Sequence, residues 1–284
     1  MTVHAVGAGQ APRRWRATPL HRLVGWELLK IRTTRMWWGL LTAGVAMALF
    51  QSIFTAALAG RSVGGQPSGL PAPDDPAVLR TLYASGFLGG YVIVLVLGVL
   101  GLAAEYRHQT ITHTFLAVPR RPRIVLAKLL AYLLAGAGFG AVLVATGVVA
   151  GGIVILLRGY PLGLDAPGVA RTIGLSVLGC AVWTIVGLGV GILIRNQVAA
   201  IVVSVLVAYL VDPLLSFGLN QVEGGGDVAR YLPSQASAAI AEGPTSGTFA
   251  VDLLPWWGGL LVLCGYGLVC AAAGTLLTLR RDVS

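Results

Sequence analysis

Six long apolar stretches constrain what this chain can fold into. Each is close to or above the roughly 20 residues that an α-helix needs to cross the hydrocarbon of a bilayer. Only 11% of the residues are charged and 56% are hydrophobic, whereas soluble domains carry about 25% charged residues. The sequence therefore predicts an all-α polytopic membrane protein with six transmembrane helices, at Met36–Leu58, Leu82–Ala104, Ile124–Leu157, Thr172–Ile194, Val198–Phe217 and Trp256–Leu279.

Two details of these stretches predict how the helices pack. The third stretch is too long for a straight span, so we expect it to tilt or to extend beyond the bilayer. Glycines four residues apart let helix backbones approach closely in lipid. Such pairs recur within the predicted spans, at Gly86/Gly90, Gly136/Gly140, Gly147/Gly151 and Gly187/Gly191.

The basic residues predict the orientation. When the spans alternate in direction, 15 of the 20 Lys and Arg residues fall on the side of the N-terminus and 5 on the other side. Cytoplasmic segments of membrane proteins carry such an excess. We therefore expect both termini in the cytoplasm and the protein in the bacterial cell (inner) membrane. The net charge of +9 reports topology, so no nucleic-acid partner is expected.

The N-terminal region divides into two parts. Residues 1–18 hold several arginines with no apolar stretch directly behind them, unlike a cleavable signal, and we expect a disordered cytoplasmic tail before a transmembrane domain over 19–284. Within Leu20–Arg35, apolar residues recur at helical spacing, which predicts an amphipathic helix in the membrane interface. The polar residues expected to face away from the apolar side are His21, Arg22, Glu27, Lys30 and Arg32. The residues of the interfacial site are Glu27, Lys30, Arg32 and Arg35. The alternative is an ordinary cytoplasmic extension of the first span.

The predicted outer segment from Gly218 to Pro255 is long for a loop, and long loops usually carry structure or function. We expect short external helices in it, one of them at Gln235–Ala241 with Ser234 as its N-cap. We also expect Asp212-Pro213 to end the regular helix of span five, because proline removes a backbone donor and clashes with the preceding turn.

Catalytic and cofactor motifs are not found in the sequence. None of the four histidines lies in a predicted span, and His108 and His113 are five apart, so they do not share a helical face. A phosphate-binding GxxxxGK[ST] loop is lacking, so we expect no enzyme activity and no cofactor bound by this chain. Carriers driven by ions normally bury several ionisable residues, and Asp212 is the one acid well within an apolar stretch. An ion-coupled secondary transporter or a non-transport membrane scaffold are the alternatives.

The segment between the second and third spans carries the clearest motif, which starts with Glu105-Tyr106-Arg107. In a helix over Thr110–Val118, the apolar residues Ile111, Phe115 and Val118 share one face. A short cytoplasmic helix with an apolar ridge fits a groove on a partner protein. The alternative is that this helix packs on its own bundle.

Three segments resemble the ABC-2 type permeases, the membrane subunits of bacterial ABC exporters. ELLKIRTTRMWW (Glu27 to Trp38) resembles the family's segment leading into span one. EYRHQTITHTFLAVPRRPRIVLAK (Glu105 to Lys128) resembles the stretch that forms its coupling helix. ARYLPSQA (Ala229 to Ala236) resembles a segment common before the last span. The chain departs from the family at Gln109, where glycine is usual, which affects the turn entering the helix.

The resemblance implies a permease dimer bound to two separate ATPase subunits, with ATP and Mg held by those subunits. The second permease is identical or a paralogue, and the substrate is a drug, peptide, lipid or glycan. Contact with the ATPase is implied for the residues of the coupling stretch, namely Glu105, Arg107, Thr110, Ile111, His113, Phe115 and Val118.

Overall fold

The computed structural model describes residues 19–63, 66–67, 71–107, 121–194, 196–241 and 253–281. Within these ranges six helical segments are long and apolar enough to cross a membrane, judged by length and composition. The prediction of a helical, multi-pass membrane protein is thereby confirmed. The predicted tail at 1–18 lies outside the described residues.

Helices make up nearly all of the described chain. The strands within the described ranges are two antiparallel strands of two residues each, β1 (Ser62–Val63) and β2 (Gln66–Pro67). The helices are α1 (Leu20–Thr33), α2 (Met36–Leu58), α3 (Pro76–Tyr83), α4 (Ser85–Arg107), α6 (Arg121–Leu157), α7 (Val169–Leu193), α8 (Gln197–Leu206), the π-helical η1 (Val207–Val211), α9 (Asp212–Asn220), α10 (Gly225–Ala229), α11 (Pro233–Ile240) and α12 (Trp256–Arg281).

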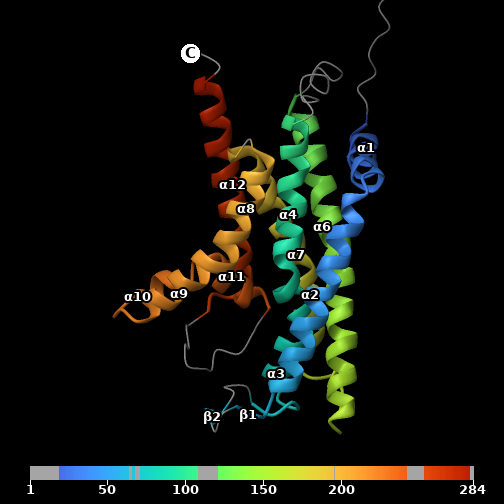
Figure 1. Cartoon of the computed structure of the whole chain (residues 1–284), viewed down its shortest axis with the longest axis vertical. Helices are drawn as coiled ribbons and strands as arrows, with labels where there is room; N and C mark the ends of the chain where they lie inside the picture. The colour runs from blue at the N-terminus through green and yellow to red at the C-terminus, as the bar shows by residue number, and fades with distance from the viewer. Residues whose placement is uncertain are drawn as a thin grey trace, which may run out of the picture.

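The predicted spans match these helices with shifted ends. The second candidate span begins at Pro76, because α3 leads into α4 with Ala84 alone between them. The long third stretch is one continuous helix of 37 residues, α6. Figure 1 places α1 and the last turns of α12 at one end of the bundle and α3 with the β1–β2 pair at the opposite end.

The core of the bundle lies between α4 and α7. These two helices pack along each other, with α2 and α6 packed on one side and α12 on α7. The approach is close because Gly98 of α4 faces Gly187 of α7. A Cβ atom on Gly187 would overlap the Leu95 carbonyl, and one on Gly98 would overlap the Thr184 carbonyl. Glycine therefore sets the distance between these helices, as the spacing of Gly187 and Gly191 predicts.

The regular α-helix of the fifth span ends at Leu206, earlier than the predicted end at Asp212-Pro213, and the candidate span runs on past the proline to Asn220. The helix widens into η1 and continues as α9. The Asp212 N–H donates to the Val207 carbonyl, five residues back, and Pro213 has no N–H, so the Ala208 carbonyl has no backbone donor. The Tyr91 hydroxyl of α4 donates to that carbonyl at 3.1 Å. A tertiary hydrogen bond therefore satisfies the group that the proline leaves unpaired.

The short helix before the last span is α11, and its N-cap is Leu232 instead of the predicted Ser234. Pro233 occupies the first helical position, which proline favours because no N–H is needed there. The Ser234 N–H donates to the carboxylate of Asp212 at 2.9 Å. Trp183 of α7 donates its indole N–H to the Ser237 hydroxyl at 2.9 Å. Side chains from α7 and α9 therefore hold α11 in the bundle.

Candidate functional site

The candidate site starts from Glu27, a carboxylate on the buried side of α1. Glu27 is 6% exposed, as is Leu23 one turn earlier. The prediction that Glu27 faces away from the apolar side of this helix is therefore wrong. The position four residues after Leu23 lies on the same helical face, and α1 lays this face against α6.

Lys128 of α6 is the partner that allows Glu27 to be buried. Its ammonium group donates to Glu27 Oε2 at 2.8 Å, and Lys30 donates to Glu27 Oε1 at 2.6 Å. The two lysines are the only lysines in the sequence, and both bind the same carboxylate. The Lys128 side chain is 10% exposed and that of Lys30 is 50% exposed. Glu27 and Lys128 therefore form a buried ion pair, with Lys30 at its edge.

The same lysine reaches the end of α4. Lys128 Nζ donates a long hydrogen bond of 3.4 Å to the Gly101 carbonyl and lies 5.6 Å from the centre of the Tyr132 ring. A Cβ atom at Gly101 would overlap that ring, so glycine is what lets Tyr132 pack against α4. Lys128 thus joins three helices, α1, α4 and α6, at one point.

The charges of the cluster control the ionisation of Glu27. Burial acts to raise the pKa of this carboxyl, but the nearby ammonium groups of Lys128 and Lys30 outweigh burial and hold the pKa below its ordinary range. Glu27 is therefore an anion at neutral pH, and its charge compensates the buried ammonium of Lys128.

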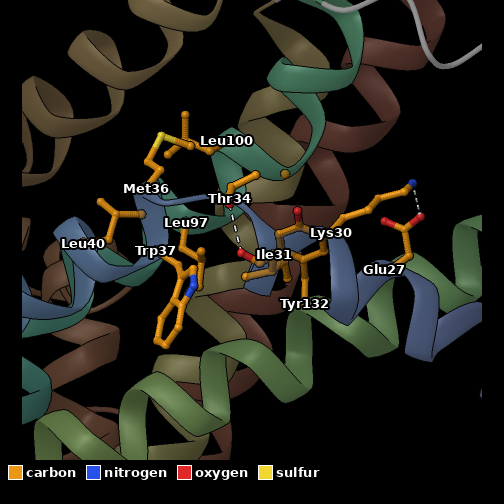
Figure 2. A pocket seen from close by; sticks show the side chains of 11 residues that line it. Glu27, Lys30, Ile31, Thr34, Met36, Trp37, Leu40, Leu97, Leu100 and Tyr132 are labelled. Atoms are coloured by element: carbon orange, nitrogen blue, oxygen red, sulfur yellow. Dashed lines mark hydrogen bonds and ion pairs between the residues drawn. The ribbon is translucent and has the colours of Figure 1, made fainter.

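A cavity of about 110 Å³ opens beside the cluster. Figure 2 shows the Glu27–Lys30 pair at one side of it and the Trp37 ring at the other. Small-molecule sites are usually about 300–1,000 Å³, so this cavity is too small for a substrate. Its lining is mostly apolar and comes from α1, α2, α4 and α6, with Ile31, Met36, Trp37, Leu40, Leu97 and Leu100.

The other predicted residues of α1 and its junction with α2 are at the surface. Arg32 and Arg35 are exposed. The Trp37 indole N–H donates to the Arg32 carbonyl at 3.0 Å, and the rings of Trp37 and Trp38 stack with centroids 4.1 Å apart. A hydrogen bond thus fixes the junction of α1 and α2. The exposed basic side chains near this junction are those of Arg32 and Arg35.

The predicted coupling residues run in the sequence from the last turn of α4 toward the start of α6. Glu105 and Arg107 belong to the last turn of α4, where the backbone alone is described. The remaining residues of that prediction lie outside the described residues, namely Thr110, Ile111, His113, Phe115 and Val118. The helices that flank this segment are the two that Lys128 ties together.

The sequence motif ends at Lys128 but does not predict its partner. Glu27 and Lys128 are 101 residues apart, and no local pattern joins them. One feature of the sequence does point to this lysine, because a charged side chain inside an apolar stretch must find a partner.

The described ranges contain no candidate metal site. No group of three or more His, Cys, Asp or Glu side chains is placed there so that it could hold a metal ion. The three cysteines are free and belong to α7 and α12.

Comparisons with known proteins found neither a matching protein-family model nor a matching curated protein.

Proposed function

We propose that this chain is the transmembrane permease subunit of an ATP-driven exporter of the ABC-2 type. The observation that carries the proposal is the Glu27–Lys128 ion pair. Its lysine, near the start of α6, is the last residue of the segment whose sequence resembles the coupling-helix stretch. Six candidate spans and the three resembling segments support the same function.

The ion pair gives this proposal a physical route for coupling. A partner that moves segment 108–120 pulls on the end of α4 and the start of α6. Lys128 contacts both α4 and α1 through Gly101 and Glu27. Because α1 leads into α2 through the fixed turn at Trp37, the motion passes to the first candidate span. In this proposal Glu27 and Lys128 are positioning residues and bind no nucleotide.

The partner subunits in this proposal follow from the resemblance, and the membrane contact and orientation follow from the amphipathic pattern and the basic residues. Two ATPase subunits hold ATP and Mg, and a second permease, identical or paralogous, completes the substrate pathway. The exposed basic side chains of α1 lie at the cytoplasmic interface of the bacterial cell membrane and contact anionic lipid. With this orientation both termini are cytoplasmic.

Co-purification tests the central claim. The tagged chain, extracted in mild detergent, should bring an ATP-binding protein with it. The double substitution Ile111→Asp with Phe115→Asp should leave the permease inserted and abolish this co-purification, because a buried apolar anchor becomes charged. Thr112→Asp with Leu116→Asp is the matched control, since it adds the same charges at the same spacing on the adjacent face.

Two outcomes would contradict the proposal at different levels. If no ATPase accompanies the wild-type chain, the ABC assignment is wrong. If the Ile111/Phe115 variant retains both the ATPase and transport, the segment packs on its own bundle and the ATPase binds elsewhere.

An ion-coupled secondary transporter is the second candidate, and buried Asp212 is the observation that favours it. Transport in ATP-depleted vesicles under an imposed proton gradient separates the two candidates. A membrane scaffold would show neither activity.

A further inference from the structure

Asp212 is a buried acid inside the fifth candidate span, at the start of α9. It is 4% exposed. Its Oδ2 accepts the backbone N–H of Ser234 at 2.9 Å, so this carboxyl binds the N-terminus of α11 from another helix. Its Oδ1 is buried and has no hydrogen-bond partner among the described residues. One of the two oxygens of this carboxyl is therefore without a partner.

No cation compensates Asp212 in the described part of the chain. The charged groups on the neighbouring α10 segment, Asp227 and Arg230, pair with each other at 3.5 Å, and α11 carries no charged side chain. A carboxylate buried without a cation is so costly that such a group normally takes up a proton instead.

Three tyrosines face this region, from α4, η1 and α12. Their hydroxyl groups donate to the backbone carbonyls of Ala208, Gly89 and Tyr231, respectively. Tyr91 and Tyr266 are close enough to interact electrostatically with Asp212. Because each phenol proton is already used, the tyrosines do not stabilise an anion here.

The Ser234 hydroxyl lies beside the carboxyl of Asp212. Its Oγ is also buried and makes no hydrogen bond of ordinary geometry to another described residue. The Asp212 carboxyl and the Ser234 hydroxyl therefore each have a buried oxygen without a hydrogen bond of ordinary geometry, Asp212 Oδ1 and Ser234 Oγ. Buried polar atoms are rarely left without a partner.

We propose that Asp212 is a proton-binding site, in which a proton on Oδ1 is donated to Ser234 Oγ. This one proton removes the buried charge and gives both oxygens a partner. Oδ2 remains free to accept the Ser234 N–H, so α11 stays bound to α9. In the alternative, Asp212 is ionised and accepts a hydrogen bond from the Ser234 hydroxyl. Both oxygens then have a partner, but the negative charge of the carboxylate is buried without a cation.

Because of where Asp212 lies, its protonation affects how α11 is held in the bundle. Asp212 connects the π-helical turn to α11, which α7 also holds through Trp183 and Ser237. Loss of the proton leaves an anion that is stabilised only if α11 moves away or a cationic group enters. Protonation is thereby linked to the docking of α11, whichever energy source drives the protein.

Infrared spectroscopy of the purified protein in lipid at neutral pH tests the proposal. The C=O stretch of a protonated carboxyl is separate from the bands of carboxylates and amides. We expect this band in the wild-type protein, its loss in Asp212→Asn and its retention in Asp227→Asn, an exposed aspartate. Ser234→Ala should keep the band and shift it, because the acid proton loses its acceptor.

If Asp212→Asn does not fold, the wild-type protein can be tested with an isotope label instead. Aspartate labelled with carbon-13 at the side-chain carboxyl should shift the band, since Asp212 is the one buried aspartate among the described residues. If the wild-type protein shows no protonated carboxyl band, or if the label leaves the band in place, Asp212 is ionised and the proposal is wrong. Neither result depends on an ATPase partner.

Discussion

Lys128 Nζ lies 2.8 Å from Glu27 Oε2, and the two residues are 101 positions apart in the chain. Both side chains are about nine-tenths buried. In an apolar surrounding neither charge is stable alone, so each explains the burial of the other. The pair holds α1 against the start of α6.

Removal of Lys128 should therefore cost more stability than removal of Lys30. Lys128→Ala leaves Glu27 with Lys30 alone and should lower the free energy of unfolding by about 3–5 kcal/mol. Lys30→Ala removes a half-exposed partner of the same carboxylate and should cost about 0–1 kcal/mol. Unfolding of the two purified variants in the same detergent measures the difference. Equal losses in the free energy of unfolding would show that the buried Lys128 contributes no more to stability than the half-exposed Lys30.

A double substitution separates the loss of the ion pair from the charge that a single substitution leaves behind. Glu27→Met with Lys128→Met should recover most of the stability that Lys128→Ala loses, because no unpaired charge remains. If the double variant is as unstable as Lys128→Ala, packing accounts for the loss and the charges do not.

The ion pair should also make stability depend on pH. The pKa of Glu27 is lowered from its ordinary value of 4.5 by Lys128 and Lys30, against the opposing effect of burial. A carboxyl with a lowered folded-state pKa stabilises the protein fully above its unfolded pKa, and this contribution is lost as the pH falls through the lowered value. Thermal unfolding between neutral and acidic pH should show a smaller loss for Glu27→Gln than for the wild-type protein. Identical pH profiles would contradict this assignment.

Close approach of α4 and α7 should make Gly187 intolerant of a side chain. Gly187→Ala forces a Cβ atom into the Leu95 carbonyl and should cost about 1–3 kcal/mol through overpacking. Gly174→Ala in the same helix is the control, because no atom lies within 4 Å of its added Cβ. It should be neutral or slightly stabilising, since alanine favours helices. If both variants are equally stable, the two helices are not in contact at Gly187.

The hydroxyl of Tyr91 should support the π-helical turn. Tyr91→Phe removes the donor to the Ala208 carbonyl and should cost about 1–3 kcal/mol, the penalty for an unsatisfied buried polar group. Tyr209→Phe removes a longer bond of 3.4 Å to the Gly89 carbonyl and should cost less. The free energies of unfolding of both variants test this order, and a reversed order would show that the Ala208 carbonyl finds another donor.

Orientation can be tested by cysteine labelling in intact cells. Glu223→Cys and His21→Cys change exposed residues near opposite ends of the predicted topology. An impermeant thiol reagent should label Glu223→Cys and leave His21→Cys unlabelled until the cells are opened. The opposite pattern would reverse the topology that the basic residues predict.

The sequence by itself determined the six candidate spans, because the hydropathy of about 20 consecutive residues is a local property. It also predicted the close helix contacts at Gly187 and Gly147, since small side chains at helical spacing leave room for a neighbouring backbone. The same kind of local pattern predicted where α1, the spans and the short helix α11 lie along the chain.

Tertiary structure alone decided the polar contacts between helices. Glu27 is polar by sequence, yet it is buried because Lys128 arrives from a helix 101 residues later. The helix continues past Asp212-Pro213 because Tyr91 of α4 supplies a donor to the Ala208 carbonyl. The first turn of α11 is held because Asp212 of α9 accepts the Ser234 N–H. Hydrophobic spacing is read along one helix, whereas the partner of a buried polar group depends on which helices meet, and folding of the whole chain determines that.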